Sequence, residues 1–477
     1  MSKQYEMVIG LEVHVELATK TKIFCGCSTA FGGEPNTHTC PVCTGMPGSL
    51  PVLNKQVLEY AIAVGLATNC EITRNCKFDR KNYFYPDNPQ NYQISQLYLP
   101  ICRNGRVDIE TENGVKSVRI HEIHMEEDAG KLIHDDWYDA SLVDYNRSGV
   151  PLIEIVSEPD MRSAEEVIAY LETLRNTIQY LGASDCKLNE GSMRADVNLS
   201  VREVGSEKFG TRTEMKNLNS FHSIMHAIKG ESERQIDLLE SGESVVQETR
   251  RWDDAKGESY SMRSKEDAMD YRYFPDPDLP PVILSEELIR DMQNRLPEFR
   301  EDKIKRYQKE FGLSEYDATI ITQSVHLARL FEATVGLGCQ AKKVSNWIMG
   351  EGLRILRERS LDPESIAITP AHFCALIKMN EEKKISNAVA KELFEEAVLS
   401  DFDPEERAKE RGHFTVRDEG LLRSTVMKVL EENTKSVEDY RGGKEKALGF
   451  LVGQTMKAMK GQADPTTVTA LLKEFLD

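Results

Sequence analysis

MVIGLEVHVEL, residues 7–17, decides the fold class of the N-terminal part of the chain, because its side chains alternate between apolar and polar. With Val8 set aside, the apolar residues share one face of an extended chain, and the other face carries Gly10, Glu12, His14 and Glu16. Such alternation is typical of a half-buried β-strand. A solvated strand face explains this segment alone equally well, so a functional interpretation requires other acids to converge on the same face.

A carboxylate also interrupts a second predicted strand, VPLIEIV at residues 150–156. Burying an unpaired carboxylate costs several kcal/mol, so we expect Glu154 to be ion-paired, hydrogen-bonded or bound to a metal. A third predicted strand, DVNLSV at residues 196–201, again has one polar and one apolar face. Asp196 and Asn198 on its polar face, and Arg194 just before it, can reach the same cleft as Glu12, His14 and Glu154. A simply solvated strand face is the alternative.

The densest group of functional side chains is HEIHMEEDAGK at residues 121–131, which follows a predicted hairpin turn at Asn113-Gly114. Two histidines, four acids and a lysine within eleven positions are typical of a site that handles metal-bound phosphate. The alternation here is imperfect, so the pattern leaves open whether Glu126 or Glu127 points inward. The expected magnesium ligands are Glu12, His14, Glu126, Glu127 and Glu154.

Within the same segment, Lys131 is a candidate phosphate ligand, whereas His121 and Glu122 are expected to be structural. A second candidate phosphate site lies in DRKNYFYPDNP at residues 79–89, a loop dense in charge, aromatic rings and proline. Its Arg80 and Lys81 are available for phosphate, and Tyr83 and Tyr85 for a base or ribose; an aromatic plug over the core is the alternative. The segment YRYFPDPDLPP at residues 271–281 has a similar composition, and its prolines predict a domain edge.

Two close cysteine pairs predict a structural metal site. C-x-C at Cys25 and Cys27 and C-x-x-C at Cys40 and Cys43 supply four thiolates, enough for one tetrahedral zinc with no open coordination position. Incidental buried cysteines are the alternative. The remaining cysteines show no partner spacing, and we interpret them as ordinary buried or surface thiols: Cys70, Cys76, Cys102, Cys186, Cys339 and Cys374.

Helical patterns separate and follow these strands. Apolar periodicity and capping residues predict helices over 54–68, 163–182 and 220–240. From about Ser285 strand signals vanish and helical periodicity continues to the end. The fold class expected is therefore α+β: a mixed N-terminal domain with a largely antiparallel sheet, followed by helices. Residues 442–461 contain one glutamate and four lysines, Lys444, Lys446, Lys457 and Lys460. This positive segment suits binding to the phosphate backbone of a nucleic acid, and a merely solvated helix is the alternative.

The composition of the 477-residue chain excludes several protein classes. Its mean hydropathy is −0.46, and no apolar run approaches the roughly 18 residues of a membrane span. The N-terminus has no secretion signal, so we expect a cytoplasmic protein without a membrane partner. A net charge of −19 argues against non-specific coating of nucleic acid. The phosphate loop, the dinucleotide fingerprint, H-E-x-x-H and G-x-S-x-G are all absent from the sequence.

Long motifs along the whole chain closely resemble the B subunits of bacterial aspartyl/glutamyl-tRNA amidotransferases. The motifs that carry the resemblance are VIGLEVH (8–14), RKNYFYPD (80–87), HMEEDAGK (124–131), PLIEIVSEPD (151–160), DYRYFP (270–275), GFLVGQ (449–454) and KGQADP (460–465). The resemblance implies a catalytic cradle domain over 1–290, a helical domain over 291–405 and a helical tail over 406–477 that grips tRNA.

The resemblance also implies an activity. A member of this family uses ATP and Mg²⁺ to phosphorylate the side-chain carboxylate of Glu or Asp misloaded on tRNA, and ammonia then displaces the phosphate. Ammonia would come from an amidase A subunit, and a small C subunit would brace the pair. Residues matching the family's metal-binding positions are Glu12, His14, Glu127 or Glu126, and Glu154, and Lys81 matches a basic active-site residue. The implied catalytic residues are Lys81, Glu127 and Glu154.

Two rival hypotheses also account for parts of the sequence. A non-catalytic tRNA-binding scaffold needs only the basic tail and the zinc, but it leaves the acids unexplained. A metal-dependent phosphohydrolase would need no partner and would act regardless of tRNA aminoacylation. The sequence does not decide whether Gln-tRNA, Asn-tRNA or both are made.

Overall fold

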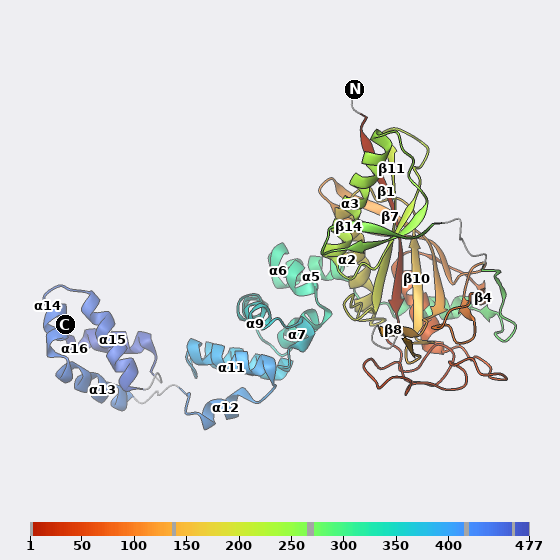
Figure 1. Cartoon of the computed structure of the whole chain (residues 1–477). Helices are drawn as coiled ribbons and strands as arrows, with labels where there is room; N and C mark the ends of the chain where they lie inside the picture. Colours follow the sequence, from red (N-terminus) through yellow and green to blue (C-terminus); the bar gives the residue numbers. More distant parts are fainter. Residues whose placement is uncertain (1–2, 136–139, 265–270, 415–418, 460–462, 477) are drawn as a thin grey trace. The chain divides into compact units, whose positions relative to one another are not determined.

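The computed structural model describes residues 3–135, 140–264, 271–414, 419–459 and 463–476. The chain divides into two compact units, Met1–Phe299 and Arg300–Asp477 (Figure 1). Among the described residues, the first unit contains the strands together with four α-helices, and the second unit is helical. This is the α+β architecture that the sequence predicts, whereas the three-domain division at residues 290 and 405 stays a prediction.

A nine-stranded sheet forms the centre of the first unit. Every neighbouring pair is antiparallel except β12 and β13, which run parallel. β1, the strand predicted from residues 7–17, lies in the interior of the sheet between β11 and β10. The strand order is β14 (Glu258–Ser264), β13 (Glu248–Asp253), β12 (Thr213–Lys216), β11 (Met193–Glu203), β1 (Tyr5–Glu16), β10 (Pro151–Ser157), β7 (Gly114–Glu127), β6 (Cys102–Thr111) and β2 (Glu71–Ile72).

Three helices pack on the apolar face of this sheet: α1 (Lys55–Ala67), α2 (Ala164–Leu181) and α3 (Phe221–Glu240). Each begins where the sequence predicts, because the side chains of Asn54, Ser163 and Ser220 accept a hydrogen bond from a backbone N–H of the first turn. α2 ends at Gly182, whose φ of +67° is the left-handed conformation that favours glycine. The core between helices and sheet includes Val13 and Ile155, both fully buried.

Smaller sheets surround the large one. The segment 271–281 and the loop 79–89, which share a composition, are joined in space, because β15 (Phe274–Pro275) pairs with β4 (Asp79–Asn82). β5 (Tyr92–Ser95) pairs with the other edge of β4. Two further two-stranded sheets consist of β3 (Asn75–Cys76) with β16 (Val282–Ile283), and of β8 (Lys131–Asp135) with β9 (Ala140–Asp144). Helix α4 (Glu286–Asn294) follows β16.

The second unit has two hydrophobic clusters, one built from residues between Tyr307 and Ala408 and one between Leu422 and Leu476. Among the described residues, no helix is long and apolar enough to cross a membrane. The α-helices of the second unit are α5 (Arg300–Phe311), α6 (Glu315–Thr322), α7 (Val325–Gly336), α8 (Ala341–Trp347), α9 (Leu353–Arg359), α10 (Pro370–Glu381), α11 (Asn387–Leu399), α12 (Pro404–Glu410), α13 (Glu419–Glu432), α14 (Thr434–Arg441), α15 (Lys446–Ala458) and α16 (Pro465–Leu476). A π-helical turn lies at Ile348–Gly352 and a 3-10 turn at Pro363–Ser365.

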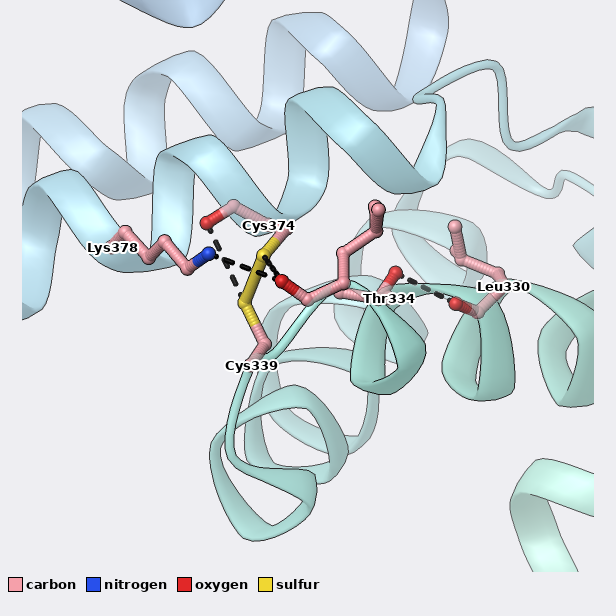
Figure 2. The surroundings of a disulfide bond; sticks show 6 residues. Leu330, Thr334, Cys339, Cys374 and Lys378 are labelled. Atoms are coloured by element: carbon pink, nitrogen blue, oxygen red, sulfur yellow. Dashed lines mark hydrogen bonds between the residues drawn. A yellow bond between two sulfur atoms is a disulfide. The ribbon is translucent and has the colours of Figure 1, made fainter.

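A disulfide corrects one expectation about the cysteines. Cys339 and Cys374, interpreted from sequence as unpartnered thiols, are bonded to each other with their Cα atoms 6.0 Å apart (Figure 2). They lie 35 positions apart, and α7, α8 and α10 bring them together. Near the bond, Lys378 Nζ donates to the carbonyl of Leu337 at 3.2 Å. Sequence spacing alone could not predict this pairing, because it depends on how helices pack.

Candidate active site

The polar face of the nine-stranded sheet gathers ionisable side chains from several neighbouring strands. Alternation along β1 puts Glu12 and His14 on this face, while the apolar residues between them enter the core. His14 lies opposite Glu154 on β10, which lies opposite His124 on β7. On the other side of β1, Glu12 lies opposite Asp196 on β11. The acids of separate predicted strands therefore converge, which a simply solvated face would not require.

The first cluster consists of His14, His124, Glu126 and Glu154. His14 Nε2 is 3.4 Å from Glu154 Oε2 and 3.6 Å from Glu126 Oε1. His124 Nε2 is 2.9 Å from the same Glu154 oxygen and 3.7 Å from Glu126 Oε2. Ligand atoms of His14, Glu126 and Glu154 all lie within 4.8 Å of one another, so these three residues can hold one cation.

Charge pairing governs protonation in this cluster. Burial disfavours a charged His124, but Glu154 and Glu126 outweigh it and raise the pKa of the imidazole to about 10. Burial likewise disfavours a charged Glu154, but His124 and His14 hold the pKa of that carboxyl well below its usual range. Glu154 is therefore the paired, ionised carboxylate that its place in an apolar strand predicts. His124 was not among the predicted ligands, although its two-residue spacing from Glu126 on a strand places both on one face.

The second cluster consists of Glu12, Asp196 and Glu214, whose ligand oxygens also lie within 4.8 Å of one another. Lys216 Nζ pairs with Asp196 and lies 2.9 Å from Glu214 Oε1. Asn198 Nδ2 donates to Glu12 Oε1 at 3.0 Å. Burial, and then the nearby Glu154, raises the pKa of Glu12. Three carboxylates around one point form a hard oxygen set of the kind that Mg²⁺ selects.

Arg194 and Asp128 supply opposite charges beside the first cluster. Arg194 lies opposite His14 across the β1–β11 pair, and its Nη2 donates to Asp128 Oδ2 at 3.0 Å. Asp128 also lies 3.4 Å from Arg147 Nε. Burial, and then repulsion from Asp128, raises the pKa of Glu16 to about 7. The polar face thus combines carboxylates with a guanidinium held in place by ion pairing, and such a cation can offset negative charge on a bound group.

Glu127 does not join either cluster. Of the two neighbouring glutamates, Glu126 is therefore the one whose side chain points toward His14 and Glu154. It follows Glu126 on β7, so its side chain leaves the opposite side of the strand. Its Oε1 accepts hydrogen bonds from Gln90 Nε2 and from Ile94 N at 2.9 Å, and burial raises its pKa to about 8. It lines a cavity of about 320 Å³ together with Lys22. The structure therefore places Glu126, and not Glu127, beside His14 and Glu154, and metal ligation by Glu126 or Glu127 stays a prediction.

Arg80 and Lys81, the two basic residues of the loop 79–89, have different surroundings. Arg80 is committed to protein contacts, because its Nε lies 2.7 Å from Asp276 and its Nη2 lies 2.9 Å from Asp278. Lys81 Nζ lies 5.0 Å from the centre of the Tyr271 ring, and the same ring packs edge-on against Tyr83. The aromatic segments thus pack on each other, as the plug interpretation expects, while Lys81 remains half-exposed.

Other predicted phosphate-binding lysines lie outside the two clusters. Lys131 begins β8 in the separate hairpin, and its side chain is exposed. Lys446 and Lys457 are exposed at the two ends of α15. Eleven residues apart, they lie on the same face of the helix, about 16 Å apart along its axis. Lys444, just before α15, pairs with Asp439 at 2.8 Å, and Lys460 lies outside the described residues.

The four cysteines of the predicted zinc motif come together. All four Sγ atoms lie within 4.8 Å of one another, and those of Cys40 and Cys43 are 3.9 Å apart. Two thiolates on a tetrahedral zinc are about 3.8 Å apart, since each Zn–S bond is about 2.3 Å. The fully buried Lys22 places its Nζ 3.5 Å from Cys43 Sγ, where a cation offsets the negative charge of a zinc tetrathiolate. The residues therefore fit a structural metal.

Comparisons with known proteins agree with this architecture. Residues 7–290 match the GatB/GatE catalytic domain, and residues 329–476 match the GatB domain. The chain is 68% identical to the B subunit of the aspartyl/glutamyl-tRNA(Asn/Gln) amidotransferase of Agathobacter rectalis, over 99% of this chain and 100% of that protein. It is 66% identical to the corresponding protein of Lachnospira eligens, again over 99% and 100%. The chain therefore belongs to the family of aspartyl/glutamyl-tRNA(Asn/Gln) amidotransferase B subunits.

Proposed function

We propose that this protein is the transamidating component of a glutamine-dependent amidotransferase that makes Gln-tRNA(Gln) or Asn-tRNA(Asn) from misacylated tRNA. The partners are an amidase A subunit that releases ammonia and a small C subunit. The observation that carries the proposal is the convergence of two metal-binding clusters, one with His14 and Glu154 and one with Glu12 and Asp196, on a single face of the sheet. Neither rival hypothesis accounts for that convergence together with the family.

The reaction proceeds in two balanced steps. An oxygen of the Glu or Asp side chain attacks the γ-phosphorus of ATP, and the bond to the bridging oxygen breaks to release ADP. The nitrogen of ammonia then attacks the acyl carbon and the carbon–oxygen bond to the phosphoryl group breaks. The departing inorganic phosphate takes up the proton that the nitrogen loses as the amide forms. Magnesium, when bound, offsets the negative charge that gathers on the phosphoryl oxygens.

The residues of this chain perform distinct parts of that work. Glu126, Glu154 and His14 would hold one cation, and Glu12, Asp196 and Glu214 a second, because each set has its ligand atoms within 4.8 Å. His124 orients Glu154 through its 2.9 Å contact. Arg194, held by Asp128, presents a guanidinium beside the first cluster. The half-exposed Lys81 remains the candidate basic residue for phosphate, whereas Arg80 is already ion-paired.

Other parts of the chain serve binding and folding. The exposed Lys446 and Lys457 on one face of α15 are suited to the tRNA backbone, and Lys444 and Lys460 flank that helix. Zinc at the four cysteines would stabilise the loop between β1 and α1 without entering the reaction. Because its substrate belongs to translation, we place the enzyme in the cytoplasm.

The test is a transamidation assay with the chain assembled with its A and C partners, supplied with glutamine, ATP and Mg²⁺. Both Glu-tRNA(Gln) and Asp-tRNA(Asn) are offered, and the amide product is measured. We expect Glu154→Gln to lower the rate roughly 100-fold or more, because a ligand of the cation that offsets the negative charge of the transition state is lost. The matched control is Glu110→Gln, an exposed acid on β6, which should change little. Failure of the wild-type enzyme to amidate either tRNA would refute the proposal.

A further inference from the structure

The Cys339–Cys374 disulfide lies in an enzyme that we place in the cytoplasm. It joins the loop between α7 and α8 to α10 (Figure 2). Cytoplasmic thiols are kept reduced, and a disulfide found there is usually transient, catalytic or redox-sensing. The surroundings of the two sulfurs therefore decide whether this bond resists exchange with cytoplasmic thiols or opens and closes by it.

The two cysteines differ in how readily the chain can uncover them. Cys339 belongs to the four-residue loop 337–340, in which Leu337 is 50% exposed and Gly338 has a φ of +88°. Cys374 lies within α10, next to the fully buried Phe373. Both cysteines are buried, but a small movement of the loop exposes Cys339, whereas exposing Cys374 requires a displacement of the helix. An attacking thiol therefore reaches the sulfur of Cys339 first.

Lys378 supplies a positive charge beside the other sulfur. It follows Cys374 by four residues on α10, so both side chains lie on one face of the helix. Lys378 Nζ donates to the carbonyl oxygen of Leu337 at 3.2 Å, and Cys374 Sγ lies 3.8 Å from the same oxygen. Figure 2 shows the ammonium group next to the disulfide. Within the part of the chain that the structure describes, no carboxylate pairs with Lys378, so its charge can act on the sulfur.

This arrangement favours the departure of Cys374 as a thiolate. A nearby cation stabilises a thiolate, and a better stabilised thiolate leaves faster in thiol–disulfide exchange. The loop therefore offers the sulfur that is attacked, and α10 offers the sulfur that leaves.

The exchange balances in two steps with a low-molecular-weight thiol as the reductant. Its thiolate attacks Cys339 Sγ, the bond between the two cysteine sulfurs breaks, and the electron pair leaves on Cys374 Sγ, which water then protonates. A second thiolate attacks the small-molecule sulfur of the mixed disulfide, so that Cys339 leaves as a thiolate and is protonated in turn. The two cysteines gain two electrons, and two small thiols are oxidised to their disulfide. The reverse steps close the bond.

Other free thiols of the chain have the opposite setting. Burial raises the pKa of Cys70 to about 11 and that of Cys186 to about 12. It also raises the pKa of Cys76 and Cys102. A thiol that stays protonated is a slow nucleophile, so these four cysteines are poor exchange partners. The cation beside Cys374 distinguishes the disulfide pair from them.

We propose that Cys339 and Cys374 form a reversible thiol–disulfide site for low-molecular-weight thiols, in which Cys339 is attacked and Lys378 stabilises the departing Cys374 thiolate. The closed bond links residues 35 positions apart within the hydrophobic cluster between Tyr307 and Ala408. Such a link restricts the unfolded chain, so the oxidised helical unit is the more stable form. The inference goes beyond the proposed function and rests on it only for the cytoplasmic location.

The test equilibrates the full chain, loaded with zinc, in mixtures of glutathione and glutathione disulfide. Free thiols are then alkylated, and mass spectrometry of the digested protein reports on Cys339 and Cys374. We expect the bond to open in a large excess of glutathione and to form again in an excess of glutathione disulfide. Calorimetry should show the melting temperature of the second unit fall by roughly 5–10 °C on opening. Cys339→Ser, which cannot form the bond, should melt at the same temperature in both mixtures.

The rate of opening tests the role of Lys378. We expect Lys378→Gln to slow opening by glutathione roughly 3- to 10-fold and Lys378→Arg to open at close to the wild-type rate, because a cation stabilises the leaving thiolate. Lys309→Gln, at an exposed position on α5, is the matched control and should open as the wild type does. Oxidised Lys378→Gln should keep the wild-type melting temperature, which a packing role for Lys378 would not allow.

Three results would overturn parts of the proposal. A bond that stays closed in excess glutathione would be a permanent structural cross-link. Thiols that stay free in excess glutathione disulfide would show that the pair is no exchange site. Opening of Lys378→Gln at the wild-type rate would remove Lys378 from the mechanism. These measurements need neither tRNA nor ATP, so they remain decisive even if the assembled enzyme amidates no tRNA and the proposed function is refuted.

Discussion

Glu231 on α3 is a fully buried carboxylate that contacts side chains of its own helix and of the neighbouring strands β12 and β13. It pairs with Arg234 at 2.6 Å, accepts from Thr213 Oγ1 at 2.9 Å and lies 3.4 Å from Arg250. Burial opposes its charge, but Arg234 outweighs it and lowers the pKa of the carboxyl below the ordinary 4.5. A depressed pKa means that the paired state stabilises the fold above about pH 4.5 and that this stability is lost as the pH falls through the lowered value.

We therefore predict that Glu231→Ala destabilises the catalytic unit by about 3–5 kcal/mol at pH 7, because two arginines lose a buried partner. The deficit should shrink as the pH falls below about 4.5, since the wild type then loses the same ion pairs. Chemical denaturation between pH 7 and pH 3.5 measures both effects. Glu233→Gln, exposed on the same helix, is the control and should change stability by less than about 0.5 kcal/mol.

Residue patterns identified most of the site but not its contacts. Glu12, His14 and Glu154 were predictable because period-two alternation marks one face of a strand. Glu126 and Glu127 could not be separated by pattern, because the polar residues of β7 near its end lie on both faces. Glu214 enters its cluster only through the pairing of β12 with β11, which alternation within a segment does not specify, whereas the two-residue spacing of His124 from Glu126 already places both on one face of β7.

At the scale of elements, the cysteine loop gives a direct prediction. We expect about one zinc per chain in the wild type and a large loss of bound zinc in Cys40→Ser, because three thiolates leave a tetrahedral site incomplete. Atomic absorption on the purified chain measures the metal. Cys70→Ser, outside the cluster, should retain zinc. Unchanged zinc content in Cys40→Ser would show that the four thiols do not hold the metal.

Helix α15 gives a second prediction. Replacing Lys446 and Lys457 together by Gln should weaken tRNA binding and lower the slope of log K against log salt by about 2, since two phosphate contacts are removed. Binding titrations of the assembled enzyme at several salt concentrations measure this slope. Lys428→Gln on α13 is the control, because this exposed lysine lies on another helix. An unchanged slope in the α15 double variant would exclude these lysines as tRNA contacts.

Structural features set by neighbouring residues in the sequence were predictable, whereas features that depend on contacts between distant segments were not. Asn54, Ser163 and Ser220 cap helices where the sequence indicates, because a cap depends on residues within one turn. The parallel pairing of β12 with β13 has no local signal, since it joins segments separated by the whole of α3. The Cys339–Cys374 bond was missed for the same reason.

At the scale of the molecule, function depends on contacts between distant parts of the chain. The two clusters draw on residues from Glu12 to Glu214, and the strand order places β1 between β10 and β11 so that both clusters share its polar face. Composition and periodicity predicted the α+β class and the helical C-terminal region, but strand order required the assembled fold. The structure thereby brings separate acidic motifs together on one surface, where two sets of three side chains can each hold a cation.

The most direct test of that claim is to trap the activated carboxylate before ammonia reacts with it. The assembled enzyme is given ATP, Mg²⁺ and Glu-tRNA without glutamine, and hydroxylamine is added to convert an acyl phosphate into a hydroxamate. We predict hydroxamate on the tRNA-bound glutamate for the wild type and roughly 100-fold less for Glu154→Gln, with tRNA binding retained. Hydroxamate formation at the wild-type rate by Glu154→Gln would contradict the assignment of the chemistry to this face of the sheet.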